Sequence, residues 1–224
     1  MAGTLCTKVA GAASTARLAA LLGAGAAALV GFAGAAHAAP GAAPPDSNHA
    51  GGMYGNPAAA APYWRHQTST DCGEMSAADV VGEVTGDEPT EQQITTMAEN
   101  TPSTVHSGSI WAPGKYTSNG DLAVLLEHYG IRAVASHSSI QALEQDLADG
   151  QKVIVGLNDE TIWNKPGDRT NEDHFVVVTG VDARAGEVHL NDSGIGNGRN
   201  EQVSIATFET AWATSHNFIV VTTR

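Results

Sequence analysis

Cys72 occupies a position at which a thiol can act as a nucleophile. It stands in the string Gln67-Thr-Ser-Thr-Asp71-Cys72-Gly73, at the expected start of an amphipathic helix. The unpaired N–H groups and the positive dipole end of a helix N-terminus stabilise a thiolate and lower the pKa of a cysteine. Gly73 has no side chain, so a substrate carbonyl can approach the backbone there. These features predict a reactive thiol, although a lone cysteine is more often a small buried apolar residue.

A thiolate needs a base, and His174 is the best candidate. It opens the run His174-Phe-Val-Val-Val, which is typical of a strand buried on both faces. A hairpin return would bring Asp192 beside His174, within reach of the second ring nitrogen. Asp173 is the alternative orienting residue, but neighbours on a strand point to opposite faces. Cys72, His174 and Asp192 together predict thiol-based catalysis, whereas each alone has an ordinary structural explanation.

Helical and strand periodicities predict the elements that must hold these residues. Helices come first, and hairpin-length connectors join the late strands. We therefore expect an α+β fold in which a helix that starts with the nucleophile packs on a mostly antiparallel sheet. Helices are predicted at residues 72–84, 91–99, 119–128, 139–149 and 205–214, and strands at residues 132–136, 152–157, 174–181, 187–191 and 217–222.

Three motifs resemble those of a known peptidase family. QTSTDCG, DHFVVVTGVD and VHLNDSG are similar, in order and separation, to the motifs of the bacteriocin-processing double-glycine-leader peptidases. These form family thirty-nine of the cysteine class, within the papain-like superfamily. The closing stretch from Thr207 to Val221 resembles the end of the secreted peptidase-like branch of that family. The resemblance covers about residues 63–222.

This resemblance implies a papain-like cysteine peptidase fold that acts on a peptide or protein substrate without a cofactor. In such a site Cys72 attacks a peptide carbonyl, His174 exchanges protons with the thiol and the leaving amine, and Asp192 holds the imidazole. The side-chain amide of Gln67 and the backbone N–H of Cys72 would form the oxyanion hole. Nothing in the chain resembles the transporter that the bacteriocin-processing relatives carry. Cleavage of double-glycine leaders therefore does not transfer to this chain.

The amino-terminal residues have the composition of an export signal. Residues 1–38 contain no Asp or Glu, and a basic start precedes an apolar run that ends in Ala-His-Ala at residues 36–38. This small-residue spacing predicts cleavage by signal peptidase and a secreted or cell-envelope protein. Residues 39–61, rich in Ala, Pro and Gly, are expected to be a flexible leader, and residues 62–224 one peptidase domain.

Charge and cysteine content limit the partners of the exported chain. Without residues 1–38, the chain has 9 Lys and Arg residues against 24 Asp and Glu residues, and Cys72 is its one cysteine. The excess of carboxylates argues against nucleic acids and anionic membranes as partners. A single cysteine excludes a disulfide within the exported chain. The chain has no HExxH string, paired cysteines or calcium-loop pattern, so no metal site is expected, and no second membrane segment is predicted.

Other interpretations stay open on the sequence. A cell-wall hydrolase of NlpC type also uses a cysteine before a histidine. Such enzymes typically show Asp-Cys-Ser-Gly, whereas Asp71-Cys72-Gly73-Glu74 stands here. A papain-like domain kept for binding would retain the same residues without turnover. Within the long connector of residues 158–173, Trp163 belongs either to a lid over the site or to a plug at the edge of the core.

We predict that the exported protein begins at Ala39. Pro40 follows the cleavage point and disfavours a cut one residue later. Amino-terminal sequencing of protein recovered from culture filtrate should read Ala39-Pro40-Gly41. Recovery of a chain that still begins at Met1 would refute both cleavage and secretion.

Overall fold

The computed structural model describes residues 52–223. The predicted signal peptide and the first part of the predicted leader, residues 39–51, lie outside the described residues. Within residues 52–223, no helix is long and apolar enough to cross a bilayer.

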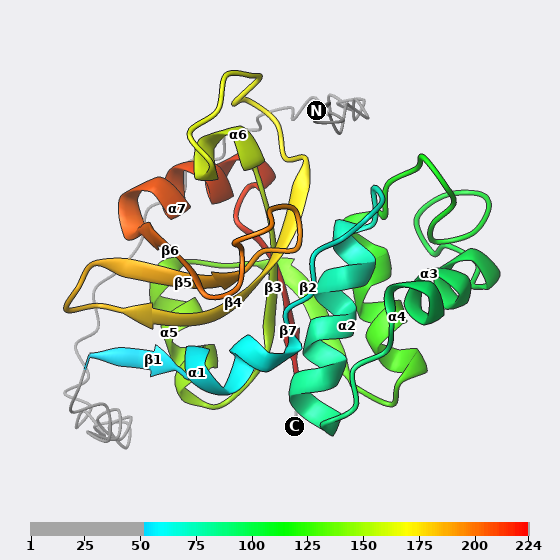
Figure 1. Ribbon diagram of the computed structural model, residues 1–224, viewed down its shortest axis with the longest axis horizontal. Helices are drawn as coiled ribbons and strands as arrows, with labels where there is room; N and C mark the ends of the chain where they lie inside the picture. Colours follow the sequence, from blue (N-terminus) through cyan, green and yellow to red (C-terminus); the bar gives the residue numbers. More distant parts are fainter. Residues whose placement is uncertain (1–51, 224) are drawn as a thin grey trace, which may run out of the picture. The chain divides into compact units, whose positions relative to one another are not determined.

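Seven strands in the described part of the chain form one sheet (Figure 1). Their order is β2-β7-β3-β4-β5-β6, with β1 paired to β4 beside this row. All the paired neighbours run antiparallel, which confirms the predicted α+β class with a mostly antiparallel sheet. The strands are β1 (Met53–Gly55), β2 (Ala133–His137), β3 (Val153–Leu157), β4 (His174–Asp182), β5 (Glu187–Asn191), β6 (Glu201–Ser204) and β7 (Phe218–Thr222).

The helices begin and end where side chains or special backbone conformations satisfy their terminal groups. Thr90 and Gln93 form a capping box at the start of α3, and Ser139 and Ser204 cap α5 and α7 through their hydroxyl oxygens. Gly86, with a φ of 80°, ends α2. The helices are α1 (Pro57–Ala60), α2 (Cys72–Thr85), α3 (Glu91–Asn100), α4 (Leu122–His128), α5 (Ile140–Ala148), α6 (Asp159–Ile162) and α7 (Ile205–Trp212), with 3-10 turns η1 (Ala61–Tyr63), η2 (Asn119–Asp121) and η3 (Ala213–Ser215).

Two hydrophobic clusters cover the two faces of the sheet. Phe175 and Val177 of β4 pack with residues of α2, α3 and α4. Val176 and Val178 pack in the other cluster, with residues of α5 and α7. The alternation follows from the period of two along a strand. β4 is therefore buried on both faces, and His174 at its start is held by rigid structure.

Residues 52–61 correct the prediction of a flexible leader without regular structure. They form β1, which pairs with the far end of β4, and α1. Asn56 caps α1 through its side chain and Pro57 follows in the first turn, a start signal that the Ala-rich composition obscured. Asn191 then donates a hydrogen bond of 3.1 Å to the Ala60 carbonyl, which ties this segment to the end of β5.

Two further elements were not predicted from the sequence. α6 lies inside the predicted connector of residues 158–173, and β6 pairs with β5. Each is four residues long. That length is too short for a helical or strand period to stand out. The five predicted helices and five predicted strands are all present, with ends shifted by no more than two residues when η2 is counted with α4.

We predict that β1 and α1 stabilise the domain. A chain that begins at Gly52 keeps both, whereas a chain that begins at Ala61 loses the β1–β4 pairing and one acceptor of the buried Asn191 amide. Loss of such an acceptor costs about 1–3 kcal/mol. In a domain of this size that lowers the thermal unfolding midpoint by about 2–4 °C per kcal/mol. Equal midpoints of the two truncated chains in calorimetry would contradict this prediction.

Candidate active site

Cys72 is the first residue of α2, which confirms its predicted place at a helix start, and it is 6% exposed. At the preceding N-cap position, the Asp71 side chain makes no capping hydrogen bond. Cys72 thus lies at the positive end of the helix dipole, which favours a thiolate.

Gly73 permits close packing around the nucleophile. A Cβ at this position would lie 3.1 Å from both Leu122 Cδ2 and Thr117 Cβ, and 3.4 Å from Phe175 Cδ2. The first turn of α2 thus lies against α4, the loop before it and the start of β4. A larger residue would require Leu122 and Thr117 to shift. The access of a substrate carbonyl at Gly73 stays a prediction.

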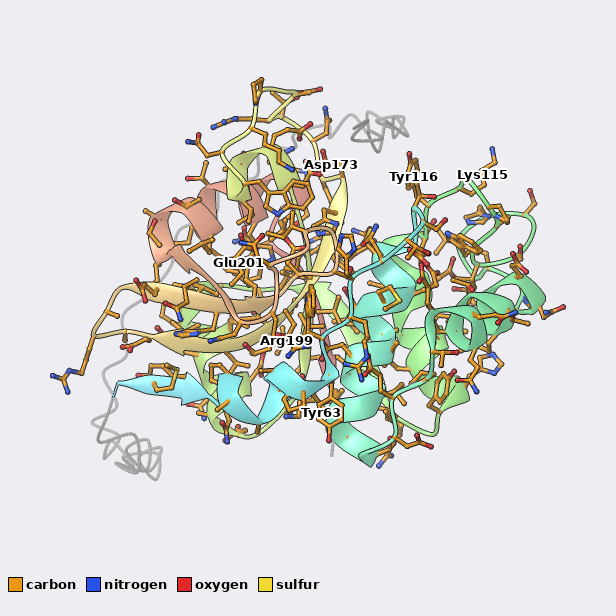
Figure 2. The ribbon with its side chains drawn as sticks, in the orientation of Figure 1. Tyr63, Lys115, Tyr116, Asp173, Arg199 and Glu201 are labelled. Carbon is orange, nitrogen blue, oxygen red and sulfur yellow. The ribbon has the colours of Figure 1, made fainter. Side chains whose placement is uncertain are left out.

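The loop before α4 is attached to the nucleophile segment. Trp111 Nε1 donates a hydrogen bond of 3.0 Å to the Thr70 carbonyl. Figure 2 shows Lys115 and Tyr116 of this loop on the side of the helices, and Asp173 on the side of the sheet. Segments from both parts of the fold therefore lie around the nucleophile.

His174 and Asp192 form a buried hydrogen-bonded pair. Nε2 of His174 lies 2.7 Å from Oδ1 of Asp192, and the two side chains are 5% and 0% exposed. His174 is the first residue of β4, and Asp192 follows the last residue of β5, the antiparallel neighbour of β4. The hairpin thus brings the two residues together as the sequence predicted. Because Asp192 engages Nε2, Nδ1 is the ring nitrogen left for the Cys72 thiol.

The surroundings of His174 favour the imidazolium ion. Burial disfavours the charged ring, but the charge and hydrogen bond of Asp192, together with those of Cys72, hold the pKa of His174 well above 6.5. Burial likewise disfavours the Asp192 carboxylate. The charge and hydrogen bond of His174, with the other hydrogen bonds to the carboxylate, outweigh this effect of burial, so the pKa of Asp192 is lowered from 3.8. The two groups therefore stabilise each other as an ion pair next to the thiol.

Trp163 contacts both members of the His174–Asp192 ion pair. Its Nε1 donates a hydrogen bond of 2.8 Å to Oδ2 of Asp192. The Trp163 and His174 rings are tilted by 58°, with centroids 5.3 Å apart, and the Lys165 ammonium lies 4.0 Å from the centroid of the Trp163 ring. Of the two roles considered for Trp163, the structure supports the position at the edge of the core, because Trp163 is partly buried and packs against the hydrophobic cluster of α5 and α7. Trp163 is a direct partner of the histidine and the aspartate, which the sequence did not reveal.

Gly194 and Trp64 also donate hydrogen bonds to Asp192. The Gly194 N–H donates to Oδ1 of Asp192 at 2.7 Å, and Trp64 Nε1 donates to the Asp192 carbonyl at 2.5 Å. A Cβ at Gly194 would lie 2.8 Å from Trp163 and 2.9 Å from His174 Cε1. The glycine of the VHLNDSG motif thus both donates to Asp192 and leaves room for Trp163 and His174.

Asp173, the alternative orienting residue, makes different contacts. Its Oδ1 accepts a hydrogen bond of 2.9 Å from the Asp159 N–H, and Asn158 Nδ2 lies 3.3 Å from its Oδ2. Asp159, Glu160 and Asp173 each bring a carboxylate oxygen within 4.8 Å of the others. Burial, with the negative charge of Asp159, raises the pKa of Asp173 to about 8. The Asp173 carboxyl thus belongs to the connector of residues 158–173, whereas Asp192 binds the imidazole.

Gln67 joins the nucleophile loop to the aspartate turn. Its backbone N–H donates to the Ser193 carbonyl at 2.9 Å, and its Oε1 accepts from the Ser193 hydroxyl at 2.7 Å. Its Nε2 donates to the Ser69 carbonyl at 2.8 Å. Gln67 is therefore close to the predicted site residues, beside the neighbour of Asp192. Its role as an oxyanion donor stays a prediction, as do the catalytic roles of the other three residues.

We predict that iodoacetamide alkylates Cys72 readily at about pH 6, well below the free-cysteine pKa of about 8.5. The imidazolium of His174 beside the thiol supports the thiolate form. His174→Ala removes this charge, and its alkylation rate should rise only near pH 8.5. Gln67→Ala is the matched control and should retain the wild-type profile, because an oxyanion donor does not act on thiol ionisation. One profile shared by the wild-type and His174→Ala proteins, with alkylation only above about pH 8, would identify an ordinary thiol.

The chain is similar to known proteins in sequence and in fold. Uncharacterized proteins of Mycobacterium bovis and Mycobacterium tuberculosis are 49% identical to the chain, over 82% of this chain and 90% of theirs. A C39-like peptidase structure from Bacillus anthracis superposes with a TM-score of 0.56 at 18% identity, over 72% of this chain and 94% of that one. A double glycine motif protease from an AMS/PCAT transporter, solved with its leader peptide, gives a TM-score of 0.48 at 14% identity, over 71% and 89% of the two chains.

A family model also matches the chain. The sequence matches the Peptidase_C39 like family over residues 59–219, which is well over half of the chain. The protein therefore belongs to the Peptidase C39-like family and to the cysteine peptidases.

Proposed function

We propose that this protein is an exported thiol peptidase that hydrolyses peptide bonds with Cys72, His174 and Asp192. One observation carries the proposal: the buried 2.7 Å contact between His174 and Asp192, with the thiol of a helix-start cysteine interacting with the same imidazole. A nucleophile, a base and an orienting carboxylate in this order are the parts that acyl transfer requires. Export is supported by the composition of residues 1–38.

Acylation begins with the Cys72 thiolate and the His174 imidazolium. The sulfur attacks the carbonyl carbon of the scissile bond, and the carbonyl oxygen becomes an oxyanion. As the C–N bond breaks, the imidazolium donates its proton to the leaving amine, which departs as the new amino terminus. The product is a thioester on Cys72 and a neutral imidazole.

Deacylation uses the same groups in reverse. The neutral His174 takes a proton from water, the hydroxide attacks the thioester carbon, and the acid product leaves as the C–S bond breaks. The thiolate and imidazolium are thereby restored. Throughout, Asp192 holds the ring orientation and stabilises the imidazolium without taking the proton. Hydrogen bonds from the Gln67 amide and the Cys72 N–H would stabilise the oxyanion in both steps.

We predict that the purified exported protein cleaves peptides and that Cys72→Ala abolishes the cleavage. Mass spectrometry after incubation with a peptide library should detect new amino termini with the wild-type protein and none with Cys72→Ala. Purified peptidoglycan is incubated in parallel. Release of cell-wall peptides without cleavage of the library would instead indicate an NlpC-type hydrolase. A folded protein inactive on both would favour a binding domain.

The same peptides test which carboxylate orients the base. Asp192→Asn should lower kcat by about 10- to 10⁴-fold, because the amide favours the wrong imidazole tautomer and cannot stabilise the imidazolium. Asp173→Asn is the matched control, since its carboxyl contacts Asp159 rather than the ring. A large loss of kcat in Asp173→Asn with none in Asp192→Asn would transfer the orienting role to Asp173.

A further inference from the structure

Glu201 is brought to Asp192 by the hairpin of β5 and β6. It is the first residue of β6 and pairs with Leu190 of β5, two positions before Asp192. Residues opposite each other on paired strands, and residues two apart on one strand, project from the same face. The side chains of Glu201 and Asp192 therefore start from the same side of the hairpin.

The loop between these residues has little freedom. The Asp192 N–H donates a hydrogen bond of 2.9 Å to the Gly198 carbonyl. A Cβ on Gly198 would lie 1.9 Å from the Asp192 carbonyl oxygen, so only glycine fits there. The Asn200 N–H donates to Oδ1 of Asn191 at 3.1 Å. The start of β6 is thus tied to the end of β5, and Glu201 is held in place.

The register of β5 and β6 brings the Glu201 carboxyl group within reach of the Asp192 carboxyl group, and the interaction between the two groups contributes to a raised pKa of Glu201. Two ionised carboxylates have only acceptor oxygens, so such a contact needs one proton. Asp192 already accepts hydrogen bonds from Trp163 and Gly194 and faces the His174 imidazolium. Those contacts favour the anion at Asp192. The proton therefore resides on Glu201, whose Oε2 is buried without a hydrogen-bond partner.

We propose that Glu201 is a positioning residue: as a neutral carboxylic acid it donates a hydrogen bond to Asp192, and through Asp192 it fixes the His174 ring. The inference rests on the proposed peptidase function, in which that ring moves protons. It adds a fourth donor to the carboxylate, beside the imidazole, the Trp163 indole and the Gly194 N–H.

The electrostatics of the pair predict how it responds to pH. Burial, followed by the charge and hydrogen bond of Asp192, raises the pKa of Glu201 from 4.5 to about 8, whereas the charges of His174 and Lys165 act in the opposite direction. Below that pH Glu201 is neutral and donates. Above it, Glu201 loses its proton, and a second negative charge stands against Asp192. Orientation of the base should therefore be present at neutral pH and lost as the pH rises past about 8.

Carbon-13 NMR of wild-type protein labelled at the glutamate side-chain carboxyl carbons tests the proton directly. The Glu201 resonance is assigned as the one missing from Glu201→Gln. The pair should titrate as a coupled system, with the step at Glu201 several units above the ordinary glutamate pKa of about 4.3. A Glu201 carboxyl that titrates near 4.3 would overturn the proposal, whether or not any peptide is cleaved. The titration itself is measured on the unaltered chain, and the Glu201→Gln spectrum serves only to assign the resonance.

Turnover of a cleaved peptide tests the positioning role. Glu201→Gln retains a neutral donor and should keep kcat near the wild-type value at pH 7, with the decline near pH 8 moved to higher pH. Glu201→Leu removes the donor and should lower kcat by about tenfold or more, as for a hydrogen bond to a charged group. A decline near pH 8 that is unchanged in Glu201→Gln would overturn the proposal.

Two control variants separate Glu201 from other carboxyl groups. Glu209→Gln alters an exposed glutamate of α7 and should keep the wild-type pH profile. Asp173→Asn removes the other carboxyl near the base whose pKa is about 8. If Asp173→Asn removes the decline and Glu201→Gln does not, the positioning role of Glu201 is refuted. If the wild-type protein cleaves no peptide, the proposed function fails, and the carbon-13 titration alone decides the state of Glu201.

Discussion

The buried hydrogen bond between His174 and Asp192 is the interaction on which the site depends. Removing an imidazolium and a carboxylate from water costs several kcal/mol per ion, and their attraction offsets that cost only with good geometry and further hydrogen bonds. Here the two atoms are 2.7 Å apart, and the carboxylate also accepts from Trp163 and Gly194. The thiol of Cys72 then adds a further favourable contact for the charged ring.

The fold holds His174 and Asp192 close to Cys72. β4 lies in the middle of the sheet and is buried on both faces, so its first residue has a rigid base. α2 packs against the same strand and carries Cys72 at its amino end. Glycine at position 73 allows close packing at this end of the helix, because a Cβ there would lie 3.1 Å from Leu122 and Thr117. The base therefore comes from the sheet, and the nucleophile comes from the helices.

Carboxyl groups are unusually prominent in the interior of this acidic chain. Burial is the main cause that raises the pKa of both Asp71 and Glu74, next to the nucleophile, to about 7. A group whose pKa is raised in the folded state binds protons more tightly there than in the unfolded chain. Its contribution therefore favours the folded state at acidic pH and declines as the pH approaches 7. Part of the excess of Asp and Glu thus lies in the surroundings of the site.

The sequence by itself determined the longer elements, the α+β class and the approach of Asp192 to His174, because these follow from periodicity and from a short hairpin. The family followed from the resemblance of three motifs to those of known peptidases. Tertiary structure alone decided the rest. Within the Ala-rich segment at residues 52–61, residues 53–55 form a strand because they pair with residues 180–182 at the end of β4. Trp163 and Glu201 reach Asp192 from distant or short elements, and such contacts leave no periodic trace in a sequence. Long-range packing, rather than local propensity, selects the partners of a buried charge.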